Sequence, residues 1–368
     1  MGDKSSEKNV RWAILGAGKI AERFSRSLAH VPGAELVAAS FRSSEKARAF
    51  ARAHNLDPKR CYADDALGRP GAAHEALLAS DDIDAVYLAL PHDLHHRWAV
   101  AALKAHKAVL CEKPAVLSAE EMEDVAHVAA EQGTLFMEAM KTRFVPIYPQ
   151  LKALLEHGAI GEVLRVETSL MNDMGDRIPS RVDYMSDRVC GGVLYDTGIY
   201  CASWLEDFLP ATPQLTALEL REDQTTGVDT YVDAELLFGV TTTARLTCAT
   251  DAPGPKAARI VGTRGTLEVD QLHRPERAVS FSPDGKSQTV EVLYEVDDFY
   301  GELAHFTELV RSGQKESPVM PLSASIRCAQ IIDAIRKPFS AGRERGPEQP
   351  AWKTRVLCAN GRRDPSRF

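Results

Sequence analysis

Short, almost continuously apolar segments alternate with amphipathic stretches along the first third of the chain. The apolar segments cover residues 10–15, 35–40, 85–90, 108–111 and 135–138, and helical periodicity covers a stretch from residue 44, residues 95–105 and residues 119–132. Uninterrupted apolar runs are typical of parallel strands that helices cover on both faces. The pattern therefore predicts an α/β domain with a doubly wound parallel sheet over residues 9–139, after a polar tail of residues 1–8. We expect the polar stretch 57–74 to form a loop with a short helix.

Beyond residue 140 the chain changes to one-by-one alternation of apolar and polar residues. The alternation covers residues 163–170 and much of 231–247, and helical patterns recur over residues 147–157, 191–208, 299–312 and 323–336. Alternation is typical of antiparallel strands with one covered face. Residues 140–338 are therefore predicted to form a second, α+β domain. The last segment, 339–368, is rich in Arg, Pro and Gly, shows no periodicity, and is predicted to be a polar extension.

The first apolar run leads into a glycine-rich turn. Gly16, Gly18, Lys19 and Ile20 directly follow the run 10–15. Glycines permit a tight turn and let a pyrophosphate approach the backbone amides at the start of the next helix, where the helix dipole favours negative charge. The turn is therefore predicted to bind a dinucleotide, which makes the first domain a candidate Rossmann domain.

The end of the second apolar run indicates which dinucleotide is bound. An NAD site places Asp or Glu here to accept a hydrogen bond from the ribose 2′-hydroxyl. This chain instead has Ser40, Arg42 and Ser43, with no carboxylate among them. A guanidinium forms a charge-assisted fork with a phosphate, and the two serines supply hydroxyl donors beside it. NADP(H) is therefore favoured over NAD(H), although Arg42 also fits a solvated position before the next helix.

Polar residues follow two later strands of the same predicted sheet. They are Pro91, His92, His95, Glu112 and Lys113. Because ligands bind at the carboxyl ends of parallel strands, we expect these residues to lie at the cofactor. A lysine in this place, after a dinucleotide-type turn, indicates redox chemistry at a nicotinamide. The two histidines either pack against the nicotinamide or simply begin the next helix.

Composition and charge exclude several classes of function. The 368 residues carry 44 Lys and Arg against 52 Asp and Glu, a formal net charge of −8, without a Lys/Arg-rich stripe, so nucleic acid is not an expected partner. No apolar stretch has the length of a membrane span and the start carries no signal-peptide pattern, so we expect a cytoplasmic protein. The seven cysteines are predicted to be reduced core thiols, and no side chains at ligand spacing indicate a metal site.

Several motifs in order along the chain together resemble one known family. They are the glycine turn at 16–21, residues 91–95, residues 112–114, the run 143–148, residues 160–163 and the glycine-rich run 191–200. Over most of its length the chain resembles the glucose–fructose oxidoreductase, inositol dehydrogenase and rhizopine catabolism family, written Gfo/Idh/MocA. Within it the chain is most similar to the branch of dimeric dihydrodiol dehydrogenases and NADP-dependent D-xylose dehydrogenases, since residue 200 is tyrosine where many sugar-oxidising relatives have histidine.

This resemblance implies a fold and a function. It implies a Rossmann domain followed by a large open antiparallel sheet, a small-molecule substrate in the cleft between them, and sheets that pair into a homodimer or higher homo-oligomer. It also implies an NADP(H)-dependent oxidoreductase acting on the CH–OH group of a sugar, polyol or trans-dihydrodiol. Two alternatives stay open: a redox-assisted, NAD-dependent glycoside hydrolase, and a non-catalytic nucleotide-sensing protein on the same scaffold.

Alcohol oxidation needs a base within hydrogen-bond reach of the substrate hydroxyl, and Tyr200 is the candidate. The free phenol has a pKa near 10, which a nearby ammonium of Lys113 would lower while also hydrogen-bonding the reacting oxygen. Asp196 lies four residues before Tyr200, so on a helix both face the same side, and its carboxylate is a candidate for orienting substrate hydroxyls or Lys113. Tyr200 also fits a core tyrosine, and Asp196 also fits a helix cap.

A charged loop precedes the candidate catalytic run. Residues 172–188 include Arg177 and Tyr184 and are expected to cover the substrate. Mixed charges suit a sugar or polyol, the arginines leave a sugar phosphate or carboxylate open, and Tyr184 with nearby methionines suits an apolar ring. Arg143 and Phe144 are further candidates for substrate contacts, although Arg143 also fits as a brace between the two domains.

Overall fold

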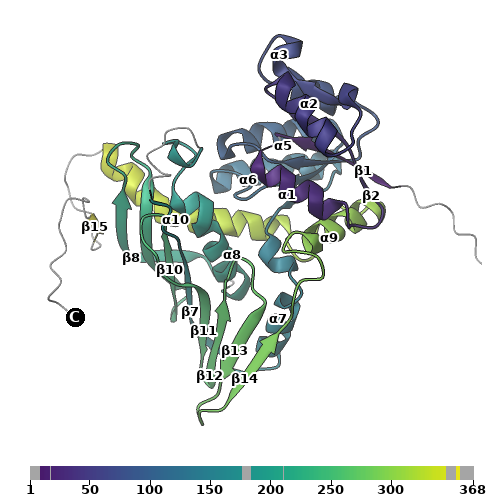
Figure 1. Ribbon diagram of the computed structural model, residues 1–368. Helices are drawn as coiled ribbons and strands as arrows, with labels where there is room; N and C mark the ends of the chain where they lie inside the picture. Colours follow the sequence, from purple (N-terminus) through teal and green to yellow (C-terminus); the bar gives the residue numbers. More distant parts are fainter. Residues whose placement is uncertain (1–8, 17, 176–183, 210, 345–353, 357–368) are drawn as a thin grey trace, which may run out of the picture. The chain divides into compact units, whose positions relative to one another are not determined.

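The chain folds as two compact units, each built around one sheet (Figure 1). The structure is a computed structural model that describes residues 9–16, 18–175, 184–209, 211–344 and 354–356, with only the backbone described at 339–344 and 354–356. The first unit contains residues 1–152 and 291–326, and the second contains residues 153–290 and 327–368. The first unit thus includes residues 291–326, which lie late in the chain. The sequence predicts only one boundary between the two domains, near residue 140.

The sheet of the first unit is parallel, as predicted. Its strands are β1 (Val10–Leu15), β2 (Ala34–Phe41), β3 (Cys61–Ala63), β4 (Ala85–Leu88), β5 (Ala108–Cys111) and β6 (Phe136–Glu138). They lie in the order β3-β2-β1-β4-β5-β6, and neighbouring strands pair in parallel. The chain runs outward from β1 to β3 and then returns to β4 beside β1, so a topological switch point lies between β1 and β4.

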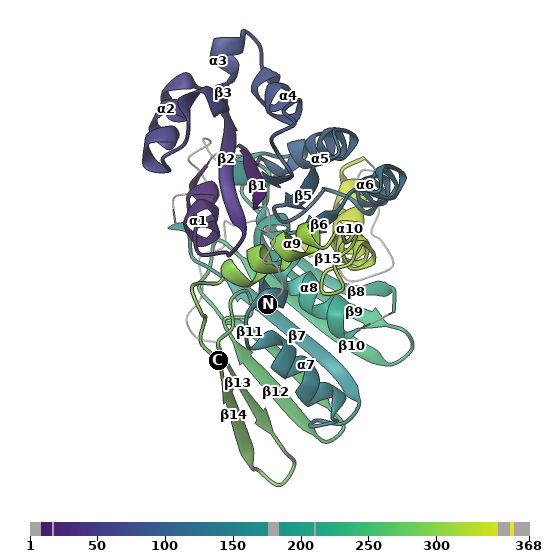
Figure 2. The same ribbon diagram turned by 90° about the vertical axis from the view of Figure 1, so that its right-hand side faces the viewer.

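Helices cover both faces of this sheet. They are α1 (Lys19–Leu28), α2 (Ser44–Ala53), α4 (Ala72–Leu78), α5 (His95–Lys104) and α6 (Ala119–Gln132). Figure 2 shows α1 and α2 on one side of β1 and β2, with α4, α5 and α6 on the other. The doubly wound prediction is therefore confirmed. The stretch 57–74, expected to be mostly loop, contains strand β3 as well as η1 (Pro58–Arg60) and α3 (Asp64–Leu67).

Helix α9 (Tyr300–Arg311) completes the core of the first unit although it lies far along the chain. The fully buried indole of Trp12 in β1 donates a hydrogen bond to the hydroxyl of Thr307 at 3.3 Å. The same ring packs against Phe24 at 5.5 Å and against Phe306 at 5.1 Å, centroid to centroid. Aromatic pairs at such distances add to the stabilisation from burial, so α9 is an integral part of this unit.

The second unit is built on a nine-stranded sheet, ordered β14-β13-β12-β11-β7-β10-β9-β8-β15. Its strands are β7 (Val163–Met171), β8 (Pro213–Glu222), β9 (Asp229–Phe238), β10 (Thr242–Ala249), β11 (Lys256–Gly262), β12 (Gly265–Asp270), β13 (Arg277–Phe281), β14 (Ser287–Glu291) and β15 (Thr354–Val356). Most pairings are antiparallel, but β7 pairs with β10, and β8 with β15, in parallel. The predicted α+β domain with a large, mostly antiparallel sheet is therefore confirmed.

The two faces of this second sheet differ, as the alternating pattern requires. One face is buried, and α8 (Ile199–Phe208) packs against it over β7 and β10. The opposite face carries a ladder of ion pairs across the strands. In this ladder Arg165 contacts Glu235 at 3.0 Å, Arg245 contacts Asp233 at 2.5 Å, and Arg259 links β11 to its neighbours.

The final segment is more ordered than its composition suggests. Helix α10 (Leu322–Glu344) continues past residue 339, and β15 pairs with β8 in register Thr354 to Leu218. Part of the segment 339–368, predicted to be a polar extension, therefore belongs to a helix and to the edge of the second sheet.

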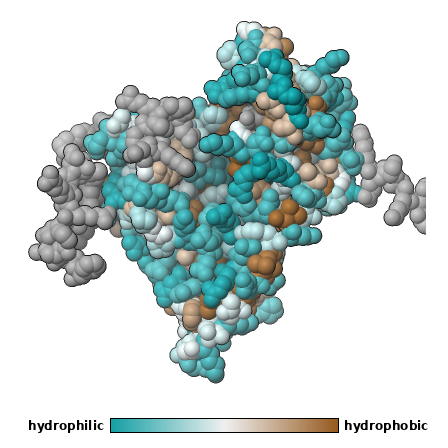
Figure 3. All heavy atoms as spheres, in the orientation of Figure 1, coloured by the Kyte–Doolittle hydropathy of each residue, from teal (hydrophilic) through white to brown (hydrophobic). Residues whose placement is uncertain are grey.

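Surface and membrane properties can be read from the described residues. Hydrophobic residues form small, separate patches on the face shown in Figure 3. No helix in the described part of the chain is both long and apolar enough to cross a membrane. The six described cysteines are free thiols, five of them buried, which agrees with reduced core cysteines.

Candidate functional site

The glycine turn of the first unit packs tightly against the end of the neighbouring strand. Gly16 has a φ of +84°, and a Cβ placed there would lie 2.4 Å from Leu90 Cδ2 and 2.7 Å from the carbonyl oxygen of Ala89. Both the left-handed backbone and the close approach therefore require glycine at this position. The turn after β1 thus meets the end of β4 at the switch point of the sheet.

The next glycine opens helix α1 and has space around it. Gly18 is the N-cap of α1, is exposed, and a Cβ added to it would meet no heavy atom within 4 Å. Lys19 is exposed and Ile20 is half-buried, while residue 17 lies outside the described residues. Amides at a helix N-terminus favour an anion, so the open side of this turn fits the phosphates of a dinucleotide.

The three candidates at the end of β2 occupy different environments. Ser40 is buried, and its hydroxyl lies 3.3 Å from the Ile14 carbonyl and 2.7 Å from His74 Nδ1. Arg42 is exposed, and Ser43 is half-buried as the N-cap of α2. Of the two hydroxyls expected beside Arg42, the one on Ser40 is therefore directed into the core, and Ser43 carries the more accessible one.

A carboxylate that the sequence did not indicate lies beside this strand end. Asp65 accepts hydrogen bonds from the amide of Ser44 at 2.9 Å and 3.0 Å, and a further one from the Ser44 hydroxyl. These hydrogen bonds hold the pKa of the exposed Asp65 carboxyl below its usual value. Asp65 follows β3, a strand of three residues that is too short to show a pattern in the sequence. The sequence therefore carries no sign that Asp65 lies at this edge of the sheet.

The loop after β5, residues 112–117, carries Lys113 and is held by carboxylates. Glu112 accepts a hydrogen bond from the Lys113 amide at 3.2 Å and another from the hydroxyl of the buried Tyr87. The amide of Ala115 donates to Glu138, at the end of β6, at 3.0 Å. Lys113 itself is half-buried, and its peptide bond to Pro114 is cis. The sheet thus fixes the backbone on both sides of Lys113.

His95 connects this loop to the end of β4. Its ring nitrogens lie 2.8 Å from the Pro114 carbonyl oxygen and 2.9 Å from the Leu90 carbonyl oxygen. Burial lowers the pKa of His95, and the two carbonyls oppose that shift. His92 is buried with its ring 5.7 Å from that of His95, whereas Pro91 is exposed. His95 therefore connects the Lys113 loop to the end of β4 through the two carbonyl groups.

The two candidates in η3 (Lys141–Phe144) lie in different environments. Arg143 is 4% exposed, and its charge acts on the buried carboxyl of Glu138. Phe144 is half-buried, with its ring 5.0 Å from the ring of His305 in α9. Arg143 is thus deep within the first unit, beside the strand end that supports the Lys113 loop.

The acid and tyrosine candidates lie on consecutive helical segments of the second unit. Asp196 is half-buried in η6 (Leu194–Gly198), a π-helical turn, and accepts a hydrogen bond from the Tyr184 hydroxyl at 3.3 Å. Tyr200 follows in the first turn of α8 and is 8% exposed. The ring of His273, which no sequence pattern singled out, lies 6.0 Å from the Tyr200 ring. The predicted helix 191–208 is therefore interrupted just before Tyr200.

The remaining candidates do not form a site of their own. Arg177 lies outside the described residues. In the described part of the chain, no three His, Cys, Asp or Glu side chains cluster as metal ligands would.

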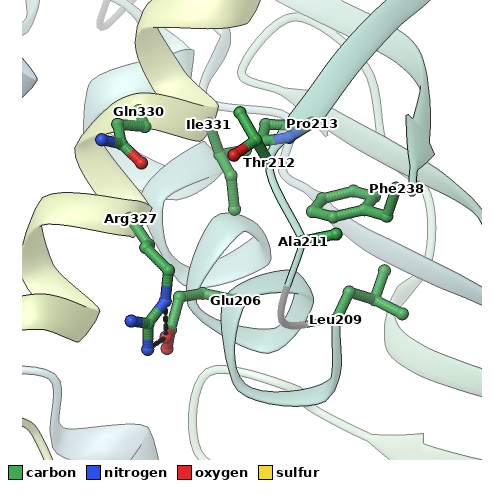
Figure 4. A pocket seen from close by; sticks show the side chains of 9 residues that line it. All are labelled: Glu206, Leu209, Ala211, Thr212, Pro213, Phe238, Arg327, Gln330 and Ile331. Atoms are coloured by element: carbon green, nitrogen blue, oxygen red, sulfur yellow. Dashed lines mark hydrogen bonds and ion pairs between the residues drawn. The ribbon is translucent and has the colours of Figure 1, made fainter.

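A small cavity of about 30 Å³ lies between α8, α10 and the ends of β8 and β9, where Glu206 pairs with Arg327 (Figure 4). It has room for a water molecule rather than a substrate.

Two models of one protein family match the chain, one in each unit. Residues 10–140 match the family model described as "Oxidoreductase family, NAD-binding Rossmann fold", and residues 148–268 match the model described as "GFO/IDH/MocA C-terminal domain". The trans-1,2-dihydrobenzene-1,2-diol dehydrogenase of Mus musculus is 32% identical over 336 residues, which cover 89% of this chain and 96% of the relative.

Two further relatives carry coenzyme names. The scyllo-inositol 2-dehydrogenase (NADP(+)) of Bacillus subtilis (strain 168) is 30% identical over 340 residues, covering 89% of this chain and 96% of the relative. A solved structure of a 3-ketoreductase from Actinomadura kijaniata in complex with NADP and TDP-benzene is similar with a TM-score of 0.79 at 25% identity. The similarity covers 95% of this chain and 99% of that chain.

Proposed function

The chain belongs to the Gfo/Idh/MocA oxidoreductase family, and we propose that it is an NADP(H)-dependent enzyme acting on the CH–OH group of a sugar, polyol or trans-dihydrodiol. The observation that carries the proposal is the support of Lys113. Its loop is fixed by Glu112, Glu138 and His95 at the carboxyl edge of the sheet that also carries the glycine turn, with β4 between the two. A lysine whose backbone is held so closely at a ligand-binding edge is suited to catalysis.

The residues at this edge fit a dinucleotide phosphate. Gly16 and Gly18 supply the tight turn and the open helix start, and Arg42 supplies an exposed guanidinium with Ser43 beside it. Arg42 forms no side-chain hydrogen bond or ion pair with the described residues, so its five donors are available to a 2′-phosphate. The NADP names of two relatives support this choice. Pro91 and His92 border the nicotinamide end of the same edge in this proposal, and the buried His95 supports that edge through the Leu90 and Pro114 carbonyls.

In this proposal Tyr200, Lys113 and Asp196 handle the proton and orient the substrate. When bound, NADP(H) would supply the hydride acceptor or donor. Tyr200 takes the proton of the substrate hydroxyl during oxidation and returns it during reduction. Lys113 assists by hydrogen-bonding the reacting oxygen and by favouring the phenolate form of the tyrosine. Asp196, which Tyr184 contacts, orients substrate hydroxyl groups.

The substrate class rests on the names of relatives and on the polar side chains near Tyr200. The relatives act on a dihydrobenzenediol and on scyllo-inositol, both cyclic compounds with neighbouring hydroxyls. Asp196 and Tyr184 supply one acceptor and one phenol for such a diol. Arg143 and Phe144 contribute to substrate positioning in the proposal, Arg143 through its effect on Glu138.

We also propose that the protein forms a homodimer or higher homo-oligomer through the open face of the second sheet. That face belongs to a nine-stranded sheet and carries paired charges such as Arg245 with Asp233 and Arg165 with Glu235. Paired charges suit a polar, wet interface between two copies. Sedimentation equilibrium should report at least a dimer, whereas a monomer at micromolar concentration would contradict the proposal.

The test is a titration with NADPH and NADH, followed by absorbance at 340 nm with a panel of aldoses, polyols, dihydrodiols and their carbonyl counterparts. Tighter binding of NADPH with substrate-dependent turnover is the expected result. Binding without turnover of free coenzyme would instead support a sensor or a glycoside hydrolase that retains its coenzyme. No binding of either nucleotide would refute the proposal at its base.

A further inference from the structure

Glu302 in the first turn of α9 is a buried carboxyl without a partner. It is 1% exposed, and neither of its oxygens accepts a hydrogen bond from any described residue. The acids before it are all engaged: Asp297 accepts two backbone amides at the start of α9, and Asp298 pairs with Arg23 and Lys141. Burying a charged carboxylate without a partner is strongly unfavourable, and such groups are rare in native proteins.

The charges that act on Glu302 come from three places in the first unit. Glu112 acts on it from the end of β5, Lys141 from η3, and Asp297 and Asp298 from the segment before α9. The ammonium of Lys141 is already committed to the Asp298 carboxylate, which also binds Arg23 of α1 at 2.5 Å. The cations of the cluster thus neutralise Asp298 rather than Glu302.

These surroundings favour the protonated form of Glu302. Burial, followed by the charge of Glu112, raises its pKa well above the usual range of a carboxyl, while Lys141 opposes the shift. Glu112 is the residue that binds the Lys113 amide and the Tyr87 hydroxyl. Glu302 is therefore linked electrostatically to the support of Lys113.

We propose that Glu302 is a positioning residue of the active site, a buried acid without a hydrogen-bond partner whose neutral form leaves the contacts of Glu112 with the Lys113 loop undisturbed. A negative charge on the buried Glu302 would act on the half-buried Glu112 and loosen its contacts. This inference rests on the proposed function, in which Lys113 acts on the substrate.

The protonation of Glu302 is testable without any activity. Its folded pKa lies above the value of about 4.3 for an exposed glutamate, so the wild type loses stability as pH rises from that value toward the folded pKa. The variant Glu302→Gln cannot ionise and lacks this loss. Its Tm relative to wild type should therefore be higher at pH 8 than at pH 5, by about 2 °C or more.

A matched control lies on the same helix. Glu308 is 65% exposed and contacts Arg311, so Glu308→Gln should show no comparable pH-dependent difference in Tm. If Glu302→Gln shows no difference between the two pH values, or a difference of opposite sign, Glu302 is ionised in the folded protein and the proposal is refuted.

The positioning role is tested by kinetics. Glu302→Gln should keep kcat at pH 7 within about threefold, because glutamine imitates the neutral acid, and should extend the alkaline limb of the kcat profile. Glu302→Ala should lower kcat by roughly tenfold or more without weakening NADPH binding. An unchanged alkaline limb, or a large loss of kcat in Glu302→Gln at pH 7, would overturn the role. If the wild type shows no NADPH-dependent turnover, the proposed function fails, and the Tm comparison alone still decides the protonation of Glu302.

Discussion

The carboxylate of Asp229 in β9 accepts a hydrogen bond from the backbone amide of Leu194 at 2.7 Å. It also lies 3.5 Å from the guanidinium of Arg336, which stacks over the ring of Tyr195 at 4.2 Å. Gly192 allows this approach, because a Cβ on it would lie 2.2 Å from Asp229 Oδ1. A strand and a helix of the second unit thus fix the π-helical turn that directly precedes Tyr200.

Removal of this clamp should destabilise the second unit. Asp229→Ala leaves the buried Leu194 amide and the Arg336 guanidinium without their shared acceptor, and we expect a loss of roughly 2–4 kcal/mol in the free energy of unfolding. Urea denaturation measures it. Asp270→Ala is the control, because Asp270 pairs with Arg277 in an exposed position and should cost less than about 1 kcal/mol. Equal effects of the two variants would contradict the clamp.

Gly16→Ala should impair both folding and coenzyme binding. The new Cβ would meet Leu90 and the Ala89 carbonyl in a left-handed backbone, which we expect to cost roughly 1–3 kcal/mol and to weaken NADPH binding at least about tenfold. Fluorescence titration gives the affinity. Gly133 also has a positive φ but no atom near its Cβ position, so Gly133→Ala should leave the affinity unchanged. Unaltered NADPH binding by Gly16→Ala would show that the turn does not hold the coenzyme.

The layout of the first unit was predictable because its strands are buried on both faces. The runs that became β1, β2, β4 and β5 are mostly apolar, and the turn at Gly16 marks where the first strand ends. Strand β3 was missed because three residues at a sheet edge carry no periodicity. The membership of α9 in this unit was also hidden, since the contact between Trp12 and Thr307 spans 295 positions and leaves no local pattern.

Arg42→Ala should change coenzyme choice rather than folding. A charged hydrogen bond contributes about 1.5–3 kcal/mol, so the Kd for NADPH should rise about 10- to 100-fold while the Kd for NADH changes little. Both constants are obtained by titration. The matched control is Arg52, an exposed arginine in the last turn of α2, the helix that follows Arg42. Arg52→Ala should alter neither constant. A parallel weakening of NADPH and NADH in Arg42→Ala would argue against recognition of a 2′-phosphate.

His95 should make the first unit sensitive to acid. Burial lowers its folded pKa, so the stability it contributes is present above the ordinary histidine pKa of about 6.5 and is lost as pH falls below that value. Wild type should therefore lose stability between pH 7 and pH 5 more steeply than His95→Gln, by roughly 1 kcal/mol. Thermal unfolding at several pH values tests this. The half-exposed His96, which contacts Asp124, serves as the control in His96→Gln. A steeper loss of stability at acid pH in His95→Gln than in wild type would show that the folded pKa of His95 is not lowered.

The candidate site was predictable where residues follow strands and less so where distant segments meet. The position of Lys113 after β5 and of Arg42 after β2 followed from the rule that ligands bind at carboxyl ends of strands. The inward direction of the Ser40 hydroxyl depends on His74, and Asp65 reaches Ser44 from another connection. Such contacts depend on tertiary packing, which the spacing of residues along a chain does not encode. The roles of Asp196 and Tyr200 stay predictions.

The measurement that tests the central claim most directly is turnover by wild type, Tyr200→Phe, Lys113→Ala and the double variant, with NADPH and one substrate identified by the panel. If the two residues act in the same proton transfer, each single variant should lose about 100-fold or more in kcat, and the double variant should lose little more than the worse single one. Turnover near the wild-type rate in the double variant would contradict the account.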